Sequence, residues 1–156
     1  MKAFFFDCGT RDATASLGIL VLRVCTGLMM VFGHGLPKLR NFDAVAEKFP
    51  VPDFFPLSYM SKQVSLGACI TGELVAASLI VLGLATRPAA FLLGFTMVVA
   101  AFHVHGAAPW FMGPGVDGAK EPALLYLIPC IALIFSGAGS YSVDSLLHQE
   151  RRRRRW

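Results

Sequence analysis

Residues 17–32 read LGILVLRVCTGLMMVF, and residues 33–39, GHGLPKL, follow without a break. The first stretch carries a single charge, Arg23, and with its flanks approaches the roughly 20 apolar residues that a helix needs to cross a bilayer. The second stretch brings His34 and Lys38 to the place where such a helix leaves hydrocarbon. Together the two stretches predict a membrane helix that ends in polar side chains.

Three further segments have the same apolar character and lie at 64–84, 89–104 and 122–139. Only residues 85–88 separate the second segment from the third, so these two segments must form a tight hairpin. With the first helix at 15–33, the sequence predicts an all-α membrane protein. We expect four transmembrane helices packed as an antiparallel bundle.

The connection between the first two helices contains a helical pattern of its own. Phe42, Val45 and Phe49 recur at helical spacing, with charged residues turned away. This pattern is typical of a short amphipathic helix in the membrane interface. We therefore expect one membrane domain at 1–147, with an interfacial helical segment, and a basic cytoplasmic tail at 148–156.

The composition excludes several classes of protein. Hydrophobic residues make up 55% of the chain and charged residues 15%, against roughly 25% charged in a soluble domain. Five of the fourteen basic residues lie in the tail at 151–155, so the positive charge is local and no nucleic-acid surface is expected. The four cysteines form no CxxC pair, which argues against zinc and thioredoxin-like sites.

The distribution of Lys and Arg predicts the orientation in the membrane. The N-terminus, the turn with Arg87 and the tail carry eight of these residues, and the connections on the other side carry five. We therefore expect a multi-pass protein of the inner (cytoplasmic) membrane with both termini in the cytoplasm.

Two charges fall near the middle of predicted helices. Arg23 is the ninth residue of the first helix and Glu73 the tenth of the second. A lone charge at that depth costs at least ~3 kcal/mol on insertion scales, so we expect the two side chains to pair. The pair would be either a structural clamp or part of a site.

A second polar set gathers where the helices reach the outer side. Arg23, Gly27, Met30, His34 and Lys38 recur at steps of three and four and share one face of the first helix. That face should meet the residues at the nearby ends of the third and fourth helices, namely His103, His105 and Glu121. The expected result is a polar pocket at the outer membrane boundary; alternatively, these residues only cap helix ends.

The pocket would suit a quinone. Imidazole and ammonium donors beside apolar walls can bind a quinone carbonyl and supply protons on its reduction. Candidate catalytic residues are Arg23, His34, Lys38 and Glu73, and candidate cofactor-binding residues are His34, His103, His105 and Glu121. His34 and His103 could in principle ligate a haem, which we consider the weaker alternative. No metal site is expected, because residues 103 and 105 do not share a helix face.

At the inner end, Arg87 should meet Asp144, which follows the fourth helix. We expect a structural ion pair that holds the helical hairpin to the end of the fourth helix.

Three motifs occur in the order known from one family: the helix-one arginine followed by GHGLPKL, then GELVAASLIVLGLATRPAA at 72–90, then EPALLYLIPCIALIFSGAGSYSVD at 121–144. On these motifs, the chain resembles the DoxX family of small four-helix membrane proteins. The resemblance implies a role in membrane redox metabolism. That role would be thiosulfate oxidation coupled to quinone reduction, or defence against oxidants and quinone-like compounds. It marks seven positions, which are Arg23, His34, Lys38, Glu73, Arg87, Glu121 and Asp144.

Two functions follow as hypotheses. The protein is a quinone-linked oxidoreductase or a subunit of one, or it is a non-catalytic anchor for a larger complex, packed through small residues such as Gly72 and Ala76. Besides the lipid bilayer, the partners to consider are a membrane or periplasmic redox subunit and a second copy of the chain.

Overall fold

The computed structural model describes residues 9–10, 12–116 and 118–153, and within these ranges the chain forms helices and no strands. The end of the predicted basic tail, 154–156, lies outside the described residues. The backbone of the tail up to residue 153 belongs to a helix, α9, Val143–Arg153.

The first long helix runs without a break over Ala13–Arg40. It consists of α2 (Ala13–Met30), a π-helical turn (Val31–Gly35) and α3 (Leu36–Arg40). The side chain of Asp12 caps its first turn by accepting a hydrogen bond from the Ala15 N–H at 2.7 Å. The helix therefore continues beyond the predicted end at residue 33, and Lys38 lies inside it.

The second and third long helices form the predicted hairpin. The second begins after the capping residue Ser61, and it ends at Gly83, whose φ of 69° is the left-handed conformation that commonly terminates helices. Each of the two helices contains a π-helical segment. Their parts are α5 (Lys62–Ile70), a π segment (Thr71–Ala76) and α6 (Ala77–Leu82), then α7 (Thr86–Val99) and a π segment (Ala100–Val104).

Three helices are long and apolar enough to cross a membrane: Ala13–Arg40, Lys62–Leu82 and Thr86–Val104. The fourth predicted span corresponds to α8, Glu121–Ser136, which is apolar but has only 16 residues. An all-helical membrane protein is thus confirmed, whereas a fourth crossing and an antiparallel four-helix bundle stay predictions.

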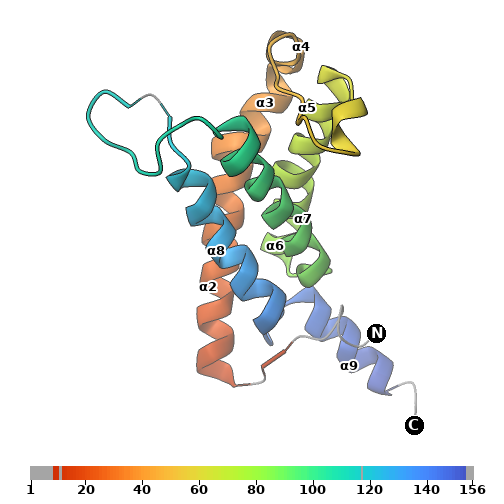
Figure 1. The fold of residues 1–156 in the computed structure, drawn as a ribbon. Helices are drawn as coiled ribbons and strands as arrows, with labels where there is room; N and C mark the ends of the chain where they lie inside the picture. Colours follow the sequence, from red (N-terminus) through yellow and green to blue (C-terminus); the bar gives the residue numbers. More distant parts are fainter. Residues whose placement is uncertain (1–8, 11, 117, 154–156) are drawn as a thin grey trace.

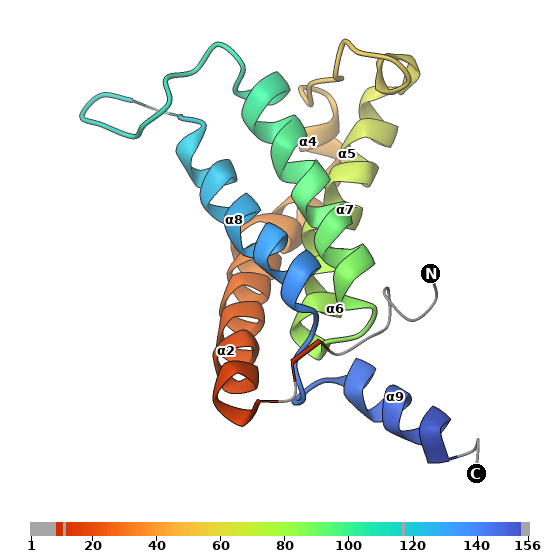
Figure 2. The same ribbon diagram turned by 60° about the horizontal axis from the view of Figure 1, so that its bottom comes forward.

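The helices lie side by side, with α8 against α7 and α2 against α6 (Figures 1 and 2). The beginning of α2 lies at the same end of the molecule as α9, which we call the α9 end. The short helix α4 (Phe42–Ala46) and the loop that follows Val104 lie at the opposite end, called the α4 end.

Close contacts fix how the first two long helices are staggered. A Cβ atom on Gly35 would lie 2.9 Å from the backbone of Glu73, and one on Gly27 would lie 2.5 Å from the Val81 side chain. Small residues at such positions let helix backbones approach closely. Glu73 therefore faces the π turn of the first helix, and Arg23 faces the end of α6.

The predicted interfacial helix exists as α4, but its apolar side chains point inward. Ala46 is buried in a small core with Leu66 and Ile70 of α5, and Phe42, Val45 and Phe49 pack against that core. The 42–49 segment is therefore a cover over the α4 end of the helices. A 3₁₀ turn, Leu57–Tyr59, completes the connection to α5.

The outward faces of the long helices are apolar. Exposed large side chains include Val21, Met29 and Phe32 on the first helix, Phe91 and Phe95 on α7, and Leu125, Ile128 and Phe135 on α8. A water-soluble chain rarely exposes so many contiguous apolar side chains, and here they provide the surface that contacts lipid.

Candidate functional site

Lys38 and Glu73 form an ion pair between the first two long helices. The Lys38 Nζ donates to Glu73 Oε1 at 2.5 Å and to Oε2 at 2.6 Å. The Glu73 side chain is only 5% exposed and that of Lys38 is 27% exposed. The same ammonium lies 3.6 Å from Cys69 Sγ. Because Gly35 brings the helices together one turn before Lys38, the lysine reaches the carboxylate directly.

A pocket of about 370 Å³ opens beside this ion pair. Its polar lining comes from His34, Lys38, Glu73, His105 and Tyr126. Most of the remaining wall is apolar and includes Met30, Met97, Ala100 and Val104. The pocket extends from the loop at the α4 end down to Glu73, so it reaches deeper than the predicted boundary position.

Part of the face of the first helix that was predicted to line a pocket does so. Met30, His34 and Lys38 contribute to the wall, whereas Arg23 and Gly27 lie against α6. The His34 ring meets the Tyr126 ring of α8 edge to face, with centroids 5.5 Å apart. Tyr126 was not predicted from the sequence, because nothing in the apolar run of α8 distinguishes it from a lipid-facing tyrosine.

Each of the three long helices changes to π geometry beside the pocket. The π turn of the first helix holds His34, that of the second holds Glu73, and that of the third holds the pocket residues Ala100 and Val104. Single π turns are rare in helices and occur frequently at functional sites. That three π turns border the same cavity is independent support for a functional site there.

His103 and Glu121 lie outside the pocket lining and contact residues next to it. The His103 ring lies against the Phe54 ring, with centroids 4.4 Å apart, and its Nδ1 is 3.3 Å from Asp53 Oδ1. Glu121 Oε2 accepts a hydrogen bond from the backbone N–H of Met112 at 2.8 Å. Since Met112 borders the pocket, Glu121 anchors the loop that covers it.

Asp53, which contacts His103, lies in the connection before α5 and has a shifted pKa. A backbone hydrogen bond, and secondly the hydrogen bond with His103, hold the pKa of Asp53 below its ordinary value. The carboxylate is therefore charged at neutral pH and available to His103.

The predicted pair of Arg23 with Glu73 is wrong. The Arg23 guanidinium is buried and donates to the backbone carbonyls of Ile80 at 3.2 Å, Val81 at 2.8 Å and Tyr141. The stagger of the helices moves Arg23 about 11 residues, or ~16 Å, from the level of Glu73. Arg23 instead satisfies carbonyls at the end of α6, where a cation also interacts favourably with the helix dipole.

Asp144 forms a backbone cap at the beginning of α7. The Asp144 carboxylate accepts hydrogen bonds from the N–H groups of Ala85 at 2.8 Å and Thr86 at 3.0 Å. These are donors without a partner inside the helix, which helices commonly satisfy with an acidic side chain. Asp144 thus ties α9 to the helical hairpin, as expected, while its ion pair with Arg87 stays a prediction.

The small residues predicted to pack against a partner protein are instead packed inside this chain. A Cβ on Gly72 would lie 2.2 Å from Thr96 Oγ1, and Ala76 is 1% exposed. Among the described residues, no group of three or more His, Cys, Asp and Glu side chains is placed to hold a metal ion.

The exposed apolar helices and the deep ion pair define an integral membrane protein with a polar pocket between its helices. A sequence profile of the DoxX family matches residues 18–106, and the chain belongs to this family.

Several relatives match over most of both chains. A protein of Haemophilus influenzae is 38% identical over 129 residues, covering 80% of this chain and 86% of the relative. A second uncharacterised protein of that organism is 25% identical over 144 residues, 90% of each chain. The Bacillus subtilis protein named "Putative oxidoreductase CatD" is 29% identical over 131 residues, 82% of this chain and 85% of the relative. No solved structure matches the chain significantly.

Proposed function

We propose that this DoxX protein is a quinone-interacting oxidoreductase, or the quinone-binding subunit of one, and that the pocket beside Lys38 and Glu73 is its quinone site. The observation that carries the proposal is the Lys38–Glu73 pair in the wall of a largely apolar pocket. The name of the Bacillus subtilis relative supports the oxidoreductase class.

The donor set fits the chemistry of a quinone, whose carbonyl oxygens need hydrogen-bond donors and whose ring needs apolar walls. Lys38, His34, His105 and Tyr126 carry donors, while Met30 and other apolar residues form the walls. The volume of about 370 Å³ lies within the range of roughly 300–1,000 Å³ for small-molecule pockets.

A bound quinone supplies the capacity to accept two electrons and two protons. The residues of the chain would bind the quinone, orient it and supply protons to it. Lys38 and His34 would donate hydrogen bonds to the carbonyl oxygens and protons on reduction, and Glu73 would hold the Lys38 ammonium in place. The electrons would come from a reduced sulfur compound or a docked redox protein, the donors implied by the family resemblance.

The same proposal includes the topology. We place the protein in the inner membrane with α8 as a fourth span and both termini in the cytoplasm. The excess of basic residues on that side supports this orientation. Cysteine accessibility on the two sides of right-side-out vesicles would test it.

The experiment that tests the function is quinone binding to the protein in lipid nanodiscs. A chainless dimethoxybenzoquinone is titrated, and the quinone carried through purification is measured by lipid chromatography. The variant K38M/E73Q removes the ammonium without leaving a buried charge behind. Loss of one hydrogen bond to a charged donor, about 1.5–3 kcal/mol, should weaken binding about tenfold or more.

Two further variants complete this experiment. Lys48→Met removes an exposed lysine outside the pocket and should bind like the wild type. His34→Phe keeps an aromatic ring against Tyr126 but has no donor, and it should weaken binding. Equal affinity in all four proteins, or no binding to the wild type, would contradict the proposal.

A further inference from the structure

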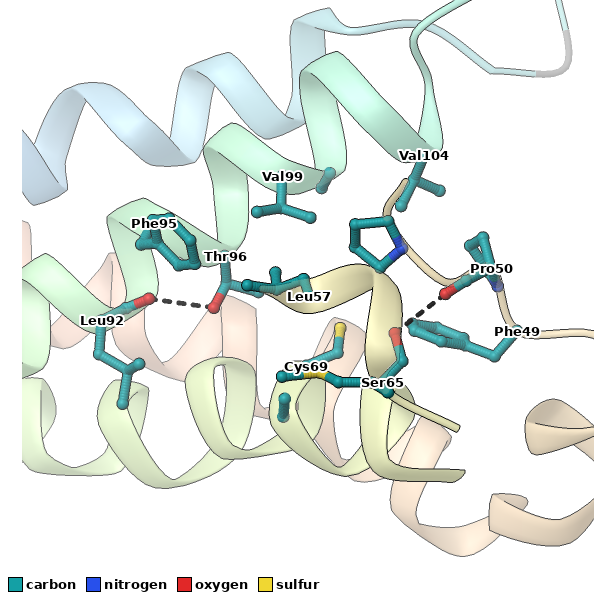
Figure 3. Close-up of a pocket in the computed structure, with 14 residues that line it drawn as sticks. Phe49, Pro50, Leu57, Ser65, Cys69, Leu92, Phe95, Thr96, Val99 and Val104 are labelled. Carbon is teal, nitrogen blue, oxygen red and sulfur yellow. Dashed lines mark hydrogen bonds between the residues drawn. The ribbon is translucent and has the colours of Figure 1, made fainter. Parts of the chain in front are cut away.

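A second, smaller pocket of about 160 Å³ lies next to the first, between α5, α7 and the connection before α5. Figure 3 shows Phe49, Leu57, Phe95, Val99 and Val104 around it. Its volume is below the roughly 300 Å³ of pockets that hold whole small molecules. It is therefore better suited to part of a molecule that continues elsewhere.

The two pockets share a wall. Phe49, Cys69, Ala100 and Val104 line both of them. Cys69 lies on the boundary, with its sulfur 3.6 Å from the Lys38 ammonium. A molecule with its polar part beside Lys38 could thus extend past Cys69 into the second pocket without crossing the bulk of the protein.

The second pocket offers almost nothing polar to a ligand. Its two hydroxyl groups already donate to backbone carbonyls, Ser65 to Pro50 at 3.0 Å and Thr96 to Leu92 at 3.0 Å (Figure 3). Burying a polar group without a partner is unfavourable. The pocket is therefore selective for an unfunctionalised hydrocarbon segment.

The pocket also borders the lipid-facing surface. Leu92 is 40% exposed and Phe95 is 41% exposed on the outward side of α7, and both line the pocket. A hydrocarbon chain could enter here sideways from the bilayer while its polar head moves toward Lys38.

We infer that the second pocket holds the apolar side chain of a membrane quinone whose head group occupies the first, so that the substrate class is chain-bearing rather than water-soluble quinones. This inference rests on the proposed function, since the head group must bind beside Lys38. The proposed occupant of the second pocket is the quinone chain. The alternative occupant that the test distinguishes is a phospholipid acyl chain.

The test is photolabelling in nanodiscs with a benzoquinone that carries a decyl chain ending in a diazirine, followed by peptide mapping. Labels should concentrate on residues 49–60 and on the 92–104 part of the third helix. The substitution Ala68→Trp adds bulk at an exposed position that lines the second pocket only. It should reduce this labelling about tenfold, the effect of about 1.4 kcal/mol of lost affinity.

The matched control is Ile128→Trp, on the exposed face of α8 and outside both pockets, which should label like the wild type. Binding of the chainless quinone reports on the fold and the head-group site, and Ala68→Trp should leave it unchanged. The inference would be overturned if the labels were spread over the lipid-facing helices, or if Ala68→Trp did not change them. In either case, binding of the chainless quinone would still support the proposed function.

A diazirine-tagged phospholipid tests the competing occupant. If it labels the same peptides and the decyl quinone does not displace it, the second pocket is a lipid site and the inference is overturned. If no quinone binds in a Lys38-dependent manner, the proposed function itself fails.

Discussion

Removing Lys38 should lower the free energy of unfolding. In Lys38→Met, the Glu73 carboxylate, which is 5% exposed in the wild type, loses its cation. Breaking a buried ion pair from one side typically costs about 3–5 kcal/mol, and the expected loss lies in this range.

Glu73→Gln in the Lys38→Met background should restore most of the loss at pH 7, because no uncompensated charge is left. Glu73→Gln alone should cost less than Lys38→Met, since the partly exposed lysine can turn its ammonium toward water.

The assay is unfolding by SDS in mixed micelles, followed by circular dichroism, with Lys48→Met as the control. An exposed lysine should change stability by no more than about 0.5 kcal/mol. The reasoning is refuted if Lys38→Met resembles this control, or if the Lys38→Met and Glu73→Gln substitutions have additive effects.

The remaining predictions concern the ends of the helices. Arg23→Lys keeps the charge but not the fork that reaches three carbonyls, and it should lower the unfolding free energy by about 2–3 kcal/mol in the same assay. Gly83→Ala should destabilise by more than about 1 kcal/mol, because φ is 69° and a Cβ would lie 2.4 Å from the Arg23 guanidinium; an unchanged midpoint would disprove this. Asp144→Ala leaves one buried and one part-buried N–H group without an acceptor and should cost about 2–4 kcal/mol, with faster hydrogen exchange at the start of α7 as its signature. Because a backbone hydrogen bond, and secondly the hydrogen bond with His103, lower the pKa of Asp53 in the folded protein, the ionised carboxylate should stabilise the connection before α5 at every pH above its ordinary pKa of about 4. This stabilisation should be lost only as pH falls through the lowered pKa; proteolysis of this connection that already increases at pH 6 in the wild type but not in Asp53→Asn would contradict this.

The helices and the pocket-facing side of the first helix could be predicted from the sequence. Apolar length predicts spans at 15–33, 64–84 and 89–104, and the structure has long apolar helices there, at Ala13–Arg40, Lys62–Leu82 and Thr86–Val104. Helical spacing groups five residues of the first helix, of which Met30, His34 and Lys38 line the pocket. Both signals are local, because they depend on residues within one helix.

The pairing of charges could not be predicted, because it depends on the stagger between helices. Counting residues from the expected ends placed Arg23 level with Glu73. The close approach of Gly35 to Glu73 shifts the first helix by about 11 residues relative to that expectation. Each glycine is visible in the sequence, but which backbone it packs against depends on the tertiary contacts.

The π turns were also missed. A π turn adds one residue without changing the apolar composition of a segment, so neither hydropathy nor residue type reveals it. His103 is predicted to line the pocket because it lies at the outer end of the third helix, but its ring lies against Phe54 and its Nδ1 against Asp53.

Glu73 is the twelfth of the 21 residues of Lys62–Leu82, while on the first long helix its backbone lies against Gly35, near the α4 end. A proton that reaches the carboxylate from the α9 end would therefore cross more of the membrane's electric field than one that reaches it from the α4 end. Moving one charge through the whole field costs ~2.3 kcal/mol per 100 mV. The rate of a reaction that moves a proton to or from Glu73 should therefore respond to the membrane voltage.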